Sequence, residues 1–339
     1  MKKFPIVKAR GTNYEVGTAI GETLEEHIAQ TLSRTHNLMK LDKGKLHYLV
    51  EPYLDFTKKY FPNLAEECQG ISDGSGISFD EVFLGNVIEA ANPDKAAYLA
   101  ERCSIIAVKT DEGYILGHNE DAYGYEVDDI YLLDAEISGN HIFGFSYVDG
   151  LIGSSVAING YGLIQAINSI PNYKVVLGIP RNIIARAVLD CKTLEEAEKL
   201  LSSVPRASGY NHVLAQGHRL WNIESSYNDT RVYEIEDENY VHTNHTLTDI
   251  LKGKDIESII DLKKSKTRYN KLCKLLPDIK TVEDIKKILS DKNEPAVSRE
   301  GTIGSIVFDA AKSVADICYG RSKYENYYEY SFKEVYDKK

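Results

Sequence analysis

The sequence predicts an α+β protein, in which a mostly helical N-terminal segment precedes two β-sheets covered by helices. Residues 12 to about 100 carry long, charged amphipathic stretches, a pattern typical of helices at a protein surface. After residue 100, short apolar or alternating runs dominate, and these are typical of strands. Because each element must bury an apolar face, two packed sheets with outer helices accommodate this order.

The expected elements follow from these runs in chain order. In the N-terminal segment, helices are expected at 15–31, 45–61 and 65–70. Strands are expected at 103–109, 114–119, 129–137, 141–148, 155–159, 162–168, 211–216, 231–236, 240–244, 303–309 and 314–319. Further helical stretches are expected near 180–189, 193–202, 264–275 and 281–289. The sequence shows no internal repeat and no low-complexity linker.

The composition is that of a folded enzyme and excludes several other classes. With 339 residues, 43% hydrophobic and 27% charged, the chain can bury a large core. Its net charge of −11 argues against a nucleic-acid partner, because phosphate binding requires clustered Lys and Arg. We expect neither a signal peptide nor a membrane partner, since no apolar run approaches the roughly 18 residues of a membrane span. Five cysteines without C-x-x-C spacing indicate a reduced, cytoplasmic protein.

Cys103 begins one of the expected strands, and the hairpin that follows it suggests chemistry. The strand 103–109 is followed by a three-residue loop, 111–113, with glycine at its third position, and then by a returning strand. Centring that loop on Glu112 sets Cys103 opposite Asp121, and directly opposed residues have Cβ atoms about 4.5–5.5 Å apart. A thiol facing a carboxylate is a candidate catalytic pair. The alternative is a buried cysteine in an ordinary strand.

Seven short motifs follow one another along nearly the whole chain. They are Gly-Thr-Asn-Tyr-Glu-Val-Gly at 11–17, Gly-Ile-Ser-Asp-Gly at 70–74, Cys-Ser at 103–104 with Gly-His-Asn-Glu-Asp at 117–121, Asn-Gly-Tyr-Gly-Leu at 159–163, Gly-Ile-Pro at 178–180, His-Thr-Asn-His at 242–245, and Gly-Arg at 320–321. In this order they resemble motifs of the acyl-coenzyme A:6-aminopenicillanic acid acyltransferase family, also called isopenicillin-N acyltransferases.

The resemblance implies an N-terminal-nucleophile hydrolase with a four-layer αββα sandwich. Members of this superfamily are made as precursors that cut themselves immediately before the nucleophile, here between Arg102 and Cys103. Residues 1–102 would be a helical leader that stays associated as a small subunit. Residues 103–339 would be the catalytic αββα domain, or large subunit. Arg102 replaces the glycine of the fungal acyltransferases, and Ser104 replaces their usual threonine.

The resemblance also implies roles for three residues of the catalytic step. Cleavage would free the α-amine of Cys103, whose ordinary pKa of about 7.7–8.0 allows it to accept the thiol proton. Asn244 would donate a hydrogen bond to the oxyanion of the tetrahedral intermediate. Asp121 would hold and orient the α-amine.

Three further residues are expected around the substrate or the cleavage site. Arg321 is a candidate partner of a substrate carboxylate, with a surface ion pair as the alternative. Asn168 matches an asparagine that related hydrolases direct toward the active site, with a strand-end turn residue as the alternative. Ser226 is similar in position to a serine linked with self-processing, or it caps a hydrogen bond in a loop.

Three functions remain open from the sequence. The preferred one is a self-processed cysteine amidohydrolase or acyltransferase that acts on a small N-acyl amide or thioester without a cofactor. Hydrolysis is favoured because the sequence shows no glycine-rich loop for a nucleotide. The second is a zinc metallohydrolase that uses His242 and His245, with His118, Glu120 and Asp121 of another segment as further candidate ligands. On a strand, however, positions 242 and 245 point to opposite faces. The third is an unprocessed, non-catalytic binding relative.

Overall fold

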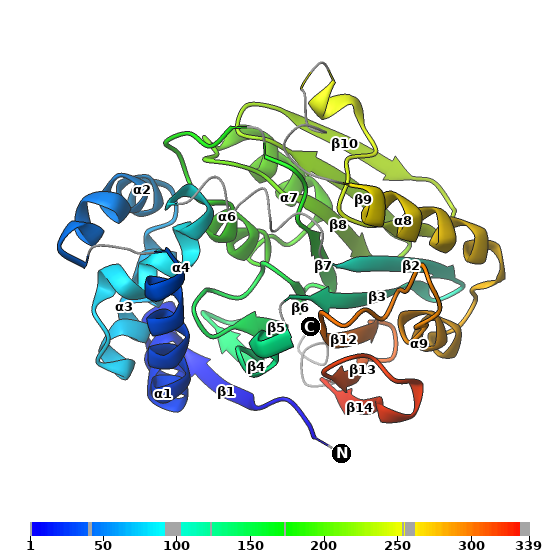
Figure 1. Ribbon diagram of the computed structural model, residues 1–339, viewed down its shortest axis with the longest axis horizontal. Helices are drawn as coiled ribbons and strands as arrows, with labels where there is room; N and C mark the ends of the chain where they lie inside the picture. The colour runs from blue at the N-terminus through cyan, green and yellow to red at the C-terminus, as the bar shows by residue number, and fades with distance from the viewer. Residues whose placement is uncertain are drawn as a thin grey trace.

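The structure is a computed structural model that describes residues 2–39, 43–91, 103–122, 124–172, 174–252, 254 and 262–332 (Figure 1). Within these residues the chain forms two β-sheets, with helices packed on the outer face of each. The layers therefore run helix, sheet, sheet, helix, as the predicted αββα fold requires. None of the described helices combines the length and apolar character that a membrane crossing needs.

The N-terminal segment contributes both a strand and a group of helices. Its elements are β1 (Ile6–Gly11), α1 (Asn13–Met39), α2 (Leu46–Tyr60), α3 (Pro62–Ser75) and α4 (Phe79–Ala91), with a short 3₁₀ turn at Lys43–Lys45. β1 pairs in parallel with a strand from the second part of the chain. The described part of the chain before residue 103 is thus helical in the main, as predicted, but it also forms an edge of one sheet.

Two of the glycine motifs explain how α1 packs against α3. Thr12 and Glu15 cap the start of α1, because the Thr12 backbone N–H donates to the Glu15 carboxylate at 2.8 Å. A Cβ atom at Gly17 would lie 2.2 Å from the backbone carbonyl oxygen of Glu67, and one at Gly70 would lie 2.1 Å from that of Tyr14. The two helices therefore approach closely only because both positions are glycine.

The two sheets contain all the strands of the described residues. The eight-stranded sheet has the order β1-β4-β5-β6-β7-β8-β9-β10, and the six-stranded sheet has the order β11-β2-β3-β12-β13-β14. The strands after β1 are β2 (Ser104–Thr110), β3 (Gly113–Asp121), β4 (Ile130–Ile137), β5 (Asn140–Tyr147), β6 (Val156–Asn159), β7 (Leu163–Asn168), β8 (Asn211–Gln216), β9 (Arg219–Ser225), β10 (Thr230–Ile235), β11 (Tyr240–His242), β12 (Thr302–Asp309), β13 (Val314–Tyr319) and β14 (Tyr328–Ser331).

The remaining helices cover the two outer faces. α6 (Arg181–Val188) and α7 (Leu194–Ser203) join α1 to α4 on the eight-stranded sheet, whereas α8 (Lys263–Leu275) and α9 (Val282–Leu289) cover the six-stranded sheet. Short 3₁₀ turns lie at Gly124–Asp128, Asp249–Leu251, Leu276–Asp278 and Tyr324–Asn326.

Alternation along β2 shows how one strand serves two cores. Ile105 and Ala107 face the core between the sheets, which also contains Phe143 of the other sheet. Ile106 and Val108 face the opposite way, toward the core beneath α8 and α9. Because successive side chains of a strand point to opposite faces, a strand buried on both sides reads as a continuous apolar run.

Most predicted elements are found within one or two residues of their expected ends. Three strands were missed: β1, β9 and β14. β1 carries charges at alternate positions, and β14 is a four-residue edge strand, so each has a weak apolar signal. β9 forms a hairpin with β8, and the turn between them contains Gly217, whose φ is +59°. Its run Leu-Trp-Asn-Ile interrupts strict alternation.

Candidate active site

The turn of the β2–β3 hairpin is one residue shorter than the sequence suggested. Thr110 pairs with Gly113, so the turn consists of two residues, Asp111 and Glu112. Gly113 has φ of +126°, and a Cβ atom there would lie 2.8 Å from the carbonyl oxygen of Gly217. That neighbouring turn therefore leaves no room for a side chain at Gly113, which is the first residue of β3.

The shorter turn changes the partner of Cys103. β2 and β3 pair Ser104 with Asn119, and continuing this register by one residue places Cys103 opposite Glu120. The predicted pairing of Cys103 with Asp121 is therefore wrong. A shift of one residue moves every side chain of a strand to the other face, so the correction identifies a different carboxylate.

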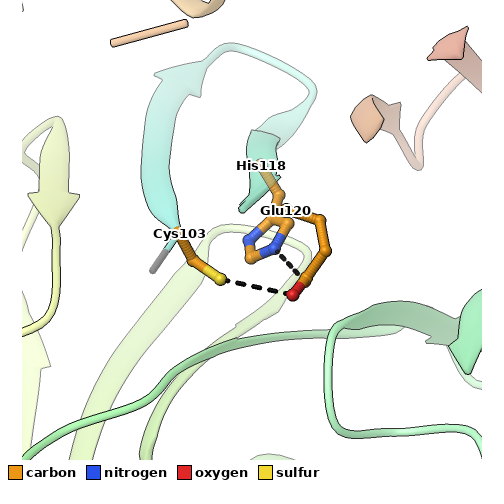
Figure 2. A group of neighbouring side chains, drawn as sticks. All are labelled: Cys103, His118 and Glu120. Carbon is orange, nitrogen blue, oxygen red and sulfur yellow. Dashed lines mark hydrogen bonds and ion pairs between the residues drawn. The ribbon is translucent and has the colours of Figure 1, made fainter. Parts of the chain in front are cut away.

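Glu120 holds a network of buried hydrogen bonds in which the Cys103 thiol takes part (Figure 2). The thiol donates to Oε1 of Glu120 at an Sγ–O distance of 3.4 Å, and the hydroxyl of Tyr147 donates to the same oxygen at 2.7 Å. The other oxygen accepts from Nε2 of His118 at 2.9 Å and from the hydroxyl of Ser155. Both strands of the hairpin and two segments of the facing sheet therefore meet at one carboxylate.

The charge of Glu120 opposes ionisation of the nucleophile. Burial, followed by the nearby carboxylates of Glu120 and Asp121, raises the pKa of the Cys103 thiol well above its ordinary value. Burial alone would also raise the pKa of Glu120, but the hydrogen bonds from His118, Ser155 and Tyr147 outweigh it and hold that pKa below the ordinary value. In the uncut chain, a neutral thiol thus faces an ionised carboxylate.

Asp121 lies beside this network but has different partners. Its Oδ1 accepts a hydrogen bond from the hydroxyl of Thr302 at 2.6 Å, and its Oδ2 lies 3.5 Å from a guanidinium nitrogen of Arg299. Burial raises the pKa of Asp121, although the charges of Arg268 and Arg299 act in the opposite direction. Asp121 therefore contributes charge near Cys103, while Glu120 contacts its sulfur directly.

Arg268 connects Cys103 to Asn244. One guanidinium nitrogen of Arg268 donates to the backbone carbonyl of Cys103 at 3.0 Å and to Oδ1 of Asn244 at 2.6 Å. The Asn244 amide donates to the carbonyl of Ser169 at 3.0 Å, and its backbone N–H donates to the hydroxyl of Ser265 at 2.8 Å. Asn244 is thus held by hydrogen bonds with Ser169, Ser265 and Arg268. The guanidinium of Arg268 links it to the backbone carbonyl of Cys103.

Asn168 and His242 belong to a second buried network. Oδ1 of Asn168 lies 2.8 Å from Nδ1 of His242, whose Nε2 lies 3.3 Å from a carboxylate oxygen of Glu224. Glu224 also accepts from the backbone N–H of Leu247 at 2.6 Å and of Thr248 at 3.1 Å. These bonds anchor the loop that carries Asn244, so Asn168 and His242 act on the site through that loop.

The two histidines proposed for zinc do not share a site. His242 faces Asn168 and Glu224, whereas Nδ1 of His245 lies 2.9 Å from the hydroxyl of Ser265. Among the residues that the structure describes, neither histidine belongs to a group of three ligand side chains close enough to hold a metal ion. The arrangement therefore gives the zinc metallohydrolase alternative no support.

The other predicted site residues either have local hydrogen-bond partners or lie outside the residues that the structure describes. The guanidinium of Arg321 donates to the carbonyl of Ser298 at 3.1 and 3.3 Å. The hydroxyl of Ser226 accepts from the backbone N–H of Asp229 at 3.1 Å, as a turn residue does. Arg102 lies outside the described residues. The roles expected for these three residues stay predictions.

Sequence reasoning missed the contacts that four residues make with this site. Glu120 and His118 lie within a quoted motif, but the sequence indicated them only as candidate ligands of the zinc alternative and not as neighbours of Cys103. Their signal was available, because two ionisable residues with a period of two in a buried strand must share one face. Tyr147 and Arg268 gave no such signal, because only the tertiary fold brings β5 and α8 to the start of β2.

We predict that Glu120→Gln lowers the pKa of Cys103, because the substitution removes an adjacent negative charge and keeps the side-chain shape. The measurement is the pH dependence of Cys103 alkylation, followed by mass spectrometry in the presence of a chelator. Glu224→Gln is the matched control, since Glu224 is equally buried beside a histidine but bonds elsewhere. An unchanged Cys103 profile in Glu120→Gln, with the fold intact by circular dichroism, would contradict the electrostatic assignment.

Comparison with known proteins gives relatives by sequence and by structure. Over 221 residues the chain is 28% identical to the β-alanyl-dopamine/carcinine hydrolase of Drosophila melanogaster. The alignment covers 58% of this chain and 57% of that protein. The chain therefore spans little more than half the length of this curated relative.

Two solved structures align at lower identity. The Caenorhabditis elegans ortholog of N-acylethanolamine-hydrolyzing acid amidase is 16% identical with a TM-score of 0.46, and the alignment covers 62% of this chain and 93% of that chain. Penicillin V acylase from Agrobacterium tumefaciens is 12% identical with a TM-score of 0.48, and the alignment covers 70% of this chain and 89% of that chain.

Residues 108–324, more than half of the chain, match the family described as acyl-coenzyme A:6-aminopenicillanic acid acyl-transferase. The chain belongs to this family.

Proposed function

We propose that the protein is a self-processed cysteine amidohydrolase that cleaves small N-acyl amides through a Cys103 acyl-enzyme. The observation that carries the proposal is the position of Cys103, whose thiol donates to Glu120 next to Asp121 and whose carbonyl accepts from Arg268, which also binds Asn244. A buried structural cysteine needs no such cluster of charged groups. Perturbed ionisable groups gathered around one nucleophile are typical of an active site.

Self-cleavage would remove the bond between Arg102 and Cys103. The thiol adds to the carbonyl of Arg102, the amide nitrogen of Cys103 takes up a proton and leaves, and water then hydrolyses the resulting thioester. Cys103 has φ of +66°, a left-handed conformation that is costly for a residue with a Cβ atom. Strain at the residue that follows the bond supports cleavage there, because breaking the bond relieves it.

In the mature enzyme, the freed α-amine of Cys103 would accept the thiol proton. The thiolate then attacks the substrate carbonyl and expels the amine, which takes up a proton, and water hydrolyses the acyl-enzyme. Asp121, buried next to Cys103, would hold the α-ammonium. One hydrogen of the Asn244 amide donates to Ser169, and we assign its second hydrogen to the oxyanion.

The relative from Drosophila melanogaster is named for β-alanyl-dopamine and carcinine, and the charges of this site suit a cationic acyl group. A β-alanyl group carries an ammonium, and two buried carboxylates, Glu120 and Asp121, lie beside Cys103. Charged hydrogen bonds contribute about 1.5–3 kcal/mol, more than neutral ones. We therefore propose β-alanyl amides as the substrate class.

Comparison of β-alanyl-dopamine with N-propionyl-dopamine tests the substrate class, because the two amides differ by the acyl amine. We expect kcat/KM to be at least about tenfold higher for the β-alanyl compound, as a charged hydrogen bond predicts. Equal values for both compounds would show that the amine is not recognised. If both compounds fail with fully cut protein, a panel of N-acyl amino acids tests the cysteine mechanism apart from this substrate class.

We predict that the purified protein consists of two polypeptides, residues 1–102 and 103–339, and that Cys103→Ala leaves a single uncut chain without activity. Intact-mass spectrometry with N-terminal sequencing measures both outcomes. Cys68→Ala, Cys191→Ala, Cys273→Ala and Cys318→Ala are the matched controls, and we expect each to be cut and active. An active protein that remains one full-length chain would refute self-processing.

We predict that Asn244→Ala lowers kcat by about 100- to 1,000-fold and changes KM little, because an oxyanion donor acts on charge that develops in the transition state. The assay uses chains already cut, obtained by co-expressing residues 1–102 with a chain that begins at Cys103. Asn244→Asp serves as a second variant, since it keeps the acceptor for Arg268 and removes the amide donor. Near-normal kcat in both variants would remove Asn244 from the oxyanion site.

A further inference from the structure

The thiol of Cys103, the imidazole of His118 and the carboxylate of Glu120 form a compact group of three different ligand types. One ligand atom from each lies within 4.8 Å of the other two, and all three side chains are buried. Figure 2 shows Cys103 and Glu120 pointing toward one another, with the ring of His118 against Glu120. His118 and Glu120 lie on β3, and Cys103 immediately precedes β2, the strand that pairs with β3.

The spacing of these atoms is close to what a tetrahedral zinc ion requires. Zinc binds thiolate sulfur at about 2.3 Å and nitrogen or oxygen at about 2.0–2.2 Å, so two ligand atoms of one tetrahedron lie roughly 3.3–3.6 Å apart. The observed Sγ–Oε1 distance is 3.4 Å, and the Nε2–Oε2 distance, to the other oxygen of Glu120, is 2.9 Å. Since one ligand atom of each residue lies within 4.8 Å of the other two, binding requires the Glu120 carboxylate and the His118 ring to adjust so that one oxygen, Nε2 and Sγ surround the ion.

The charges of the group favour a divalent cation. A Cys103 thiolate and the Glu120 carboxylate carry two negative charges, which Zn²⁺ neutralises, while His118 binds as a neutral imidazole. Tyr147 and Ser155 already orient the carboxylate, as outer partners do for metal ligands. The Nδ1 atom of His118 is buried without a hydrogen-bond partner among the described residues, so the ring lacks the second bond typical of a permanent site.

We propose that Cys103, His118 and Glu120 form a reversible zinc site whose occupation blocks the nucleophile. Binding replaces the S–H bond of Cys103 with a Zn–S bond and releases the thiol proton to solvent. The proton on Nε2 of His118 moves to Nδ1, which leaves Nε2 free to bind the ion, and no oxidation state changes. A water molecule or hydroxide completes the tetrahedron. Zinc is thus an inhibitor at this position, because the sulfur that must attack the substrate is the ligand. Binding of the ion is independent of the proposed function, whereas inhibition rests on it.

Calorimetric titration of the full chain with ZnCl₂, after treatment with a chelator, tests the binding. We expect one Zn²⁺ per chain in the wild type and in two controls, Cys191→Ala and His245→Gln. Cys191 is another buried free thiol, and His245 belongs to the histidine motif outside this group. We expect His118→Gln and Cys103→Ala to lose this equivalent. Equimolar binding that persists in both variants, with each folded by circular dichroism, would overturn the site.

Alkylation of the wild type provides a test that needs no variant. We expect Zn²⁺, but not Mg²⁺, to protect Cys103 from iodoacetamide, with protection removed by the chelator and detected by peptide mass spectrometry. Unprotected Cys103 at saturating zinc would equally overturn the proposal. If the protein hydrolyses none of the amides tested, both measurements still decide whether the site exists. If it does hydrolyse them, equimolar zinc should abolish turnover and the chelator should restore it.

Discussion

The hydrogen bond between the Cys103 thiol and the Glu120 carboxylate is the interaction on which the chemistry of this site depends. It joins the first residue before β2 to the end of β3, and it is buried. Two unit charges about 4 Å apart repel by about 4 kcal/mol at an effective dielectric constant of 20, more than a typical hydrogen bond contributes. The contact therefore requires a protonated thiol, and ionisation of Cys103 must break it or bring a positive charge alongside.

Three layers of the sandwich supply different chemical groups to the surroundings of that contact. The hairpin of the six-stranded sheet supplies the nucleophile, His118 and Glu120, and the facing sheet supplies the hydroxyl of Tyr147 at the end of β5. Arg268 reaches the carbonyl of Cys103 from α8, the helix that packs on the outer face of the six-stranded sheet. Because the site is built from both sheets and an outer helix, its geometry depends on the packing of the whole fold.

The sequence predicted those features that depend on local pattern and missed those that depend on contact between distant segments. Alternation and apolar runs located most strands, and the ordered motifs identified the family, because both are properties of consecutive residues. The predicted partner of Cys103 was wrong by one residue, since the turn has two residues and Gly113, read from the sequence as part of the loop, already pairs with Thr110. Arg268 was not foreseen, because nothing around it indicates that its guanidinium enters the site.

The anionic surroundings of Cys103 give three cations a common target. On the proposed mechanism, the first is the α-ammonium that cleavage creates at Cys103 itself, the second is the ammonium of a β-alanyl substrate, and the third is Zn²⁺. The carboxylates of Glu120 and Asp121 raise the pKa of the Cys103 thiol, and a cation placed beside them would counteract this rise. The three cations differ in what happens to the sulfur. On these proposals, the two ammonium groups would leave the thiolate free to attack and zinc would bind it, so the same electrostatic field would support both activation and inhibition.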